Sequence, residues 1–173
     1  NALVAEMTRV LGRIISMHWD PREELLLMGL ASGDVYVWDF ASRRNSLDGV
    51  ESYISGIAPI VGLAFHPSGR SFFSVEEDGK VSLWRLLRTE EEIGLRETKL
   101  FSDNKPQGKT RQDTSVSSNR ILDVVLGKAG KYLYLAAEDG RVRILKVRGL
   151  KPDSTIEAAS EAVLSMTTLT HPS

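Results

Sequence analysis

The chain has 173 residues, of which 42% are hydrophobic, enough to bury a sizeable core. Lys and Arg number 22 against 23 Asp and Glu, so no strong overall field attracts nucleic acid or an anionic membrane. The absence of cysteine excludes disulfides, thiol nucleophiles and thiolate metal sites, and it favours cytoplasmic or nuclear localisation.

The sequence contains no segment expected to span a membrane. Its longest apolar run, residues 25–31, is far shorter than the roughly 20 residues that a spanning helix needs. The opening residues lack a signal-peptide pattern. Because the first residue is Asn1 and not Met, we expect this N-terminus to be an expression or cleavage boundary.

Three stretches of the chain repeat one pattern. The first reads IISMHWDPREELLLMGLASGDVYVWDF at 14–40, the second IVGLAFHPSGRSFFSVEEDGKVSLWRL at 60–86, and the third ILDVVLGKAGKYLYLAAEDGRVRILKV at 121–147. Two sets of positions keep spacings of 46 and then 61 residues: Trp19, Phe65 and Leu126 in the first run of each copy, and Val35, Val81 and Val142 in the last. The chain is therefore built from repeats.

Each copy predicts strands, because its apolar runs are short, rich in β-branched and aromatic residues, and separated by turn signals. Asp-Gly pairs at 78–79 and 139–140 lie between runs at hairpin spacing. A fourth, outer strand is expected in each unit, at 50–54, 96–101 and 155–158, and residues 3–10 are a candidate outer strand before the first copy.

The predicted repeat units span residues 14–54, 60–101 and 121–158, and a fourth begins at about Val163. A polar insertion at 102–119 explains the longer second spacing, since its removal leaves 43 residues. This insertion lacks hydrophobic periodicity, so we expect a mobile connection between an outer strand and the next inner strand.

The repeats resemble those of the WD-repeat family of β-propellers, through GDVYVWD at 33–39, DGKVSLW at 78–84 and DGRVRIL at 139–145. The resemblance implies an all-β fold of four-stranded antiparallel blades, here about three and a half blades of a partial β-propeller. Structural roles are expected for Trp38, Asp78, Gly79, Trp84, Asp139 and Gly140. No Gly-His pair precedes a copy, so the blades are expected to lack the family's buried polar network and to rely on apolar packing.

A partial propeller would expose apolar faces at its two ends, which soluble monomers rarely tolerate. We therefore expect the remaining blades, about seven in all as the resemblance implies, to come from sequence missing from this chain.

No catalytic constellation is visible. His18 lies at a strand end, and His66 and His171 lie in His-Pro turns, none of them close in sequence to a second His or to an acidic pair. The glycines fall singly in turns and form no phosphate-binding loop. We predict no enzyme activity, no catalytic residues, no metal and no cofactor.

For several residues the sequence allows either a binding role or a purely structural role. Trp19, Trp38 and Trp84 could anchor an interface, but their repeated positions favour packing between blades. The two Asp-Gly turns could bind a cation, although a plain turn is the commoner reading. Arg43-Arg44 is similar to a phosphoinositide-binding Phe-Arg-Arg-Gly motif but lacks the adjacent Phe and the Gly, which favours a solvated loop.

In the family, the connections between blades and the turns after the second strand share one face that often binds partners. The resemblance places six candidate partner-binding residues near that rim: Arg13, Glu76, Glu77, Asn119, Arg120 and Glu138.

The leading functional hypothesis is a non-catalytic scaffold that presents loops to other proteins, within a multi-subunit complex. The alternative is a propeller that binds a small ligand or acts as a hydrolase, for which the inner strands offer mainly Asp123 and His18. Binding of phospholipid or nucleic acid is a third hypothesis, weakened by the near-neutral charge.

Overall fold

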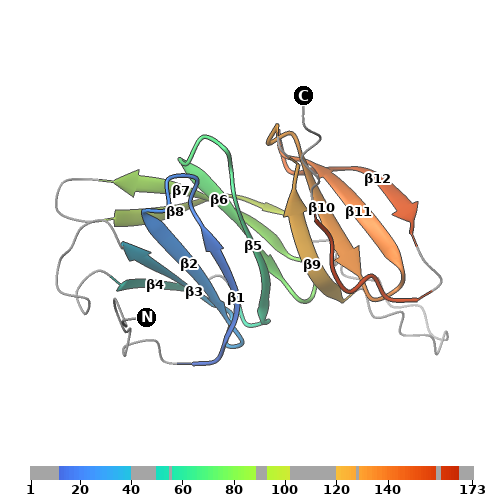
Figure 1. Cartoon of the computed structure of the whole chain (residues 1–173), viewed down its shortest axis with the longest axis horizontal. Coiled ribbons are helices and arrows are strands. Elements are labelled where there is room, and N and C mark those ends of the chain that lie inside the picture. The colour runs from blue at the N-terminus through green and yellow to red at the C-terminus, as the bar shows by residue number, and fades with distance from the viewer. Residues whose placement is uncertain are drawn as a thin grey trace, which may run out of the picture.

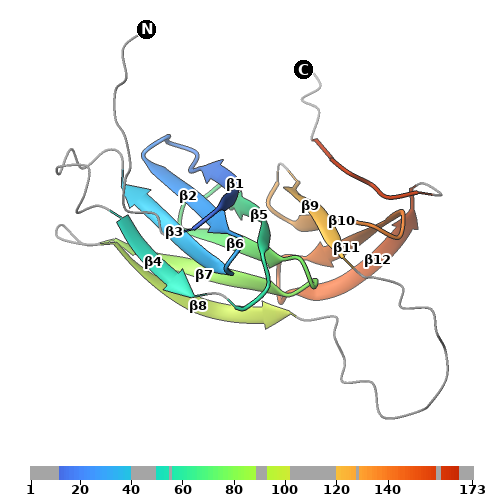
Figure 2. The ribbon, with the colours of Figure 1, turned by 90° about the horizontal axis from the view of Figure 1, so that it is seen from below.

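The computed structural model describes residues 12–39, 50–54, 56–88, 93–101, 120–127, 129–158 and 161–167. These residues form three antiparallel four-stranded sheets that lie side by side, with the first and third sheets at the two ends (Figures 1 and 2). No helix in the described ranges is long and apolar enough to cross a bilayer.

Within each sheet the strands follow one another in chain order as a meander. The first sheet contains β1 (Ile14–Trp19), β2 (Leu25–Leu30), β3 (Asp34–Asp39) and β4 (Val50–Ile54). The second contains β5 (Ile60–Phe65), β6 (Ser71–Glu76), β7 (Val81–Arg88) and β8 (Ile93–Phe101). The third contains β9 (Ile121–Leu126), β10 (Tyr132–Ala137), β11 (Arg141–Lys146) and β12 (Lys151–Glu157). The predicted all-β fold of four-stranded antiparallel sheets is confirmed.

The outer strands differ in extent from the prediction. β4 has the expected bounds, whereas β8 begins earlier, at Ile93, and β12 runs from Lys151 to Glu157. All seven residues of β12 are exposed, so its sequence carries no apolar alternation, and pairing with β11 sets its length. The candidate strand at 3–10, the insertion at 102–119 and the Arg43-Arg44 pair lie outside the described residues.

The core lies between neighbouring sheets. Val35 is fully buried between the first and second sheets, and Val81 is fully buried between the second and third. Val142 has the equivalent place in the third sheet but is partly exposed, because its side of that sheet has no described sheet against it. The three valines thus occupy corresponding positions in successive sheets.

The inner strands β5 and β9 approach each other closely at a glycine. A Cβ on Gly62 would overlap with Cγ1 of Val124 and would lie 2.9 Å from its Cβ. Only hydrogen fits at position 62, so this glycine sets the distance between the second and third sheets.

One polar pair is buried in the second sheet, where the family's buried polar network was expected to be missing. Trp84 donates a hydrogen bond from Nε1 to Ser74 Oγ over 2.8 Å, and its ring stacks on Phe72 with centroids 6.2 Å apart. Part of a buried polar network is therefore present, and the prediction missed Ser74. Trp38 has the equivalent position in the first sheet, where it alternates with Val37 and so faces away from the second sheet, partly exposed.

Candidate functional site

One end of the three sheets carries a repeated backbone contact. In each sheet, the residue before the inner strand accepts a hydrogen bond from the turn between the second and third strands: Arg13 from Ala31 (2.9 Å), Pro59 from Glu77 (2.8 Å) and Arg120 from Glu138 (2.9 Å). We call the side chains at this end, Arg13, Glu77, Arg120 and Glu138, the turn rim. The repeat of the backbone contact gives the turn rim a fixed geometry.

The second and third sheets meet in the turn rim through an ion pair. Arg120 contacts Oε1 of Glu77 through both Nε and Nη2, each at 2.5 Å, and the backbone N–H of Ile121 donates to the carbonyl of Glu77 over 2.9 Å. Glu138 donates its N–H to Arg120 and is itself exposed. Three of the predicted binding residues, Glu77, Arg120 and Glu138, are therefore adjacent, and Arg13 is exposed at the same end of the first sheet.

Glu76 differs from the other predicted binding residues because it is only 2% exposed. Its carboxylate forms an ion pair with Lys80 Nζ at 2.6 Å and packs against Gly56, where an added Cβ would overlap with it. Strand alternation turns this side chain into the junction of the first two sheets rather than to solvent. Asn119 lies outside the described residues.

The two Asp-Gly pairs, at 78–79 and 139–140, form tight turns between strands. Asp78 Oδ1 accepts the N–H of Lys80 over 3.0 Å, and Asp139 Oδ1 accepts the N–H of Arg141 over 3.2 Å. Gly79 and Gly140 have φ of 88° and 77°, which glycine adopts without steric cost.

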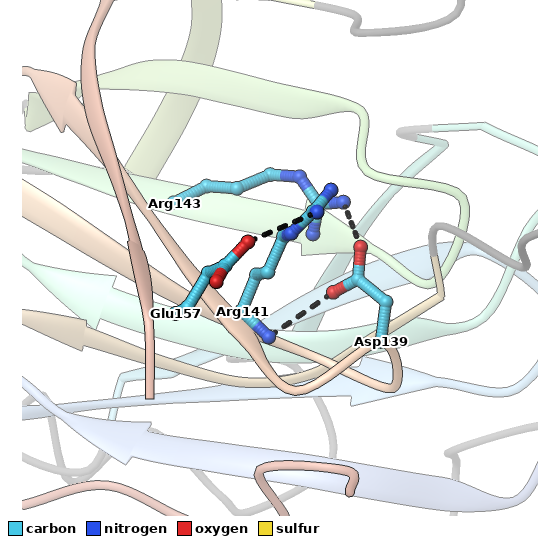
Figure 3. Close-up of polar contacts among 4 residues, drawn as sticks. All are labelled: Asp139, Arg141, Arg143 and Glu157. Carbon is cyan, nitrogen blue, oxygen red and sulfur yellow. Dashed lines mark hydrogen bonds and ion pairs between the residues drawn. The ribbon is translucent and has the colours of Figure 1, made fainter. Parts of the chain in front are cut away.

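Beside the second of these turns, two arginines of β11 bind carboxylates (Figure 3). Arg143 Nη2 contacts Asp139 Oδ2 at 2.7 Å, and Arg141 Nη2 contacts Glu157 Oε1 at 3.2 Å. Both of these arginines of β11 thus have an acidic neighbour.

A small cavity opens between the second and third sheets near the turn rim. Its volume is about 110 Å³, and its lining includes Asp78, Phe101, Arg143 and Pro152. Sites for drug-sized ligands measure about 300–1,000 Å³, so this cavity accommodates a single side chain or a very small molecule rather than a cofactor. Sequence reasoning had not identified it, because its walls come from strands far apart in the chain.

His18 and His66 contact backbone and side-chain groups within the fold. His18 Nδ1 lies 2.7 Å from the carbonyl oxygen of Trp19, and its ring contacts Phe65. His66 Nδ1 lies 2.9 Å from Ser68 Oγ within its own turn. Within the described ranges, no group of three or more His, Asp or Glu side chains could hold a metal ion, and His171 lies outside those ranges.

Asp123, the inner-strand acid, binds backbone. Its Oδ1 accepts the N–H of Val124 over 2.8 Å and its Oδ2 accepts the N–H of Met166 over 2.7 Å. Both carboxylate oxygens are thereby engaged, and the segment after the third sheet is held against β9.

Comparison with known proteins adds one match. Residues 48–85 match the family model described as WD domain, G-beta repeat. No curated protein matches the chain. The matched range runs from β4 into β7 and includes the Asp78-Gly79 turn and Trp84, which belong to the second of the three motifs that carried the resemblance. Residues 48–85 thus match one WD40 repeat, and the three four-stranded antiparallel sheets are consistent with blades of a partial propeller.

Proposed function

We propose that the chain is a non-catalytic scaffold that binds partner proteins through the turn rim, as part of a multi-subunit assembly in the cytoplasm or nucleus. The observation that carries this proposal is the repeated backbone contact, which holds exposed or partly exposed charged side chains in fixed places on successive sheets. A preorganised surface loses little entropy on binding, which favours recognition of other macromolecules.

The small-ligand alternative has less support. Asp123 and His18 already make backbone contacts, and the cavity near the turn rim is too small for a cofactor. Since WD40 repeats typically carry no catalytic residues, we favour the scaffold.

The test is affinity capture of the complete protein with charge reversal in the turn rim. We expect stoichiometric partners that are lost with Arg120→Glu and Glu138→Lys. Arg70→Glu is the matched control, because Arg70 is exposed at the opposite end of the second sheet. Recovery of the bait alone, or equal recovery of partners with rim and control variants, would contradict the proposal.

The same proposal includes further blades against the third sheet. Val163 donates its N–H to Ala137 over 3.3 Å, and Met166 donates to Asp123. In the first sheet, Ser16 holds the position equivalent to Asp123, and its Oγ donates to the Ile60 carbonyl of the next inner strand over 2.6 Å. These contacts support the proposal that a fourth inner strand begins within residues 163–167.

Hydrogen exchange of the complete protein tests this placement. We expect slow exchange at the Met166 amide and burial of Leu164, which is 75% exposed here. Asp123→Ala should accelerate exchange at Met166. Fast exchange of this amide in the unmodified complete protein would contradict a further blade at this position.

A further inference from the structure

The end of the third sheet opposite the turn rim gathers cations from two neighbouring turns. Lys131 closes the β9–β10 turn, Arg148 lies within the β11–β12 turn, and Lys146 and Lys151 flank that turn. The turns touch, because the N–H of Val147 donates to the Lys131 carbonyl over 2.9 Å. Lys146 and Lys151 face each other across the hairpin. We call these four cations the basic end.

A buried residue fixes the backbone of the basic end. Leu150 has a φ of 47°, which is strained for a side chain of its size, yet it is only 5% exposed and belongs to the core between the second and third sheets. Gly149 beside it has a φ of 100°. The packing of Leu150 therefore holds the β11–β12 turn, so the charges project from a rigid support.

The basic end has few carboxylates of its own. Lys146 pairs with Asp153 at 2.5 Å, and the hydrogen bond and charge of Asp153 raise the pKa of Lys146. Lys131, Arg148 and Lys151 are exposed and have no ion pair within the part of the chain that the structure describes. At the opposite end of the same sheet, Arg141 and Arg143 each have an acidic neighbour (Figure 3). Among the described residues of the third sheet, the surplus of positive charge therefore lies at the basic end.

From this surplus we infer that the basic end binds an acidic, extended segment of a partner protein. Four strands about 4.8 Å apart make an edge roughly 15 Å wide, which about four or five extended residues would span. Acidic side chains along such a segment would complement Lys131, Arg148 and Lys151. This inference deepens the proposed scaffold function and rests on it.

The surroundings favour a peptide over a membrane or a nucleic acid. Among the described residues, the exposed large apolar side chains lie outside the two turns, and Leu150 is buried, so nothing here would insert into a bilayer. The whole chain has a net charge of −1, without the extended positive field that phosphate backbones attract.

The experiment uses the complete protein and a fluorescently labelled peptide of alternating Glu and Ser, with binding followed by anisotropy. The test variant is the triple substitution Lys131→Ser, Arg148→Ser and Lys151→Ser. The matched control is Arg141→Ser, an exposed cation at the opposite end of the same sheet. Since exposed charge pairs each contribute modestly, the triple variant should bind about tenfold more weakly while the control binds as the unmodified protein does. Added salt should weaken binding to the unmodified protein.

Equal binding by the triple variant and the control would overturn the inference, provided that both melt as the unmodified protein does. Binding of phosphatidylserine vesicles or single-stranded RNA in place of the peptide would also overturn it. Partners that are lost with Arg120→Glu but retained by the triple variant would leave the scaffold function standing and remove only the role of the basic end.

Discussion

Gly62→Ala tests the packing of successive sheets most directly. The new methyl group would lie 2.9 Å from Val124 Cβ, an atom that side-chain rotation cannot move, so β5 and β9 must separate. Overpacking of this kind costs about 1–3 kcal/mol, and a contact this close to the backbone belongs near the upper limit. The lower backbone entropy of alanine in the unfolded chain offsets about 0.4–1 kcal/mol. The net loss in the free energy of unfolding is therefore about 2 kcal/mol.

Urea unfolding of the full chain measures this loss. With a slope of about 2 kcal/mol per molar urea, the midpoint should fall by roughly 1 M. Gly94→Ala in β8 is the matched control, because its nearest side-chain neighbour is Leu87 Cβ at 3.6 Å, an ordinary contact. Adding Val124→Ala to Gly62→Ala removes the overlap with Cγ1 but keeps the Cβ contact, so it should restore only part of the loss, about 1 kcal/mol as a coupling energy. Equal midpoints for the two Gly→Ala variants would refute the close approach of β5 and β9.

Three further predictions concern single contacts. Trp84→Phe removes the buried bond to Ser74 and should lower unfolding stability by about 1–2 kcal/mol in urea melts, so an unchanged midpoint would argue against that bond. Asp20 is buried and accepts three backbone N–H groups in the β1–β2 turn. Asp20→Ala should therefore lower the free energy of unfolding by about 2–3 kcal/mol, and Asp20→Asn should lower it less. Equal losses for the two variants would speak against the carboxylate contacts. Asp153→Asn should bring the pKa of Lys146 back toward 10.5 in an NMR titration. Because this pKa is raised in the folded state, the stabilisation from the Lys146–Asp153 pair is complete below pH 10.5 and is lost as pH rises through the folded pKa. If Asp153→Asn left the titration of Lys146 unchanged, the pair would be ruled out.

Features that depend on short stretches of the chain could be predicted from the sequence. The Asp-Gly turns and the spacing of Val35, Val81 and Val142 identified repeated antiparallel strands, because glycine conformation and strand alternation are local properties. The extent of β12 was not predictable, since an exposed outer strand needs no apolar pattern and takes its length from pairing with β11.

Some features of the candidate site could likewise be predicted from the sequence, and others could not. The rim position of Glu77, Arg120 and Glu138 followed from turn placement within a repeat, although the contact between Glu77 and Arg120 joins residues 43 positions apart. The burial of Glu76 did not follow, because its neighbour Gly56 comes from the connection between two sheets.

Local chemistry in the amino-acid order thus specifies strands, tight turns and their repetition. The stacking of sheets then determines which equivalent residues are buried, as it covers Val81 and leaves Val142 partly exposed. The physical reason is that burial depends on what the neighbouring sheet supplies, and that neighbour lies tens of residues away along the chain.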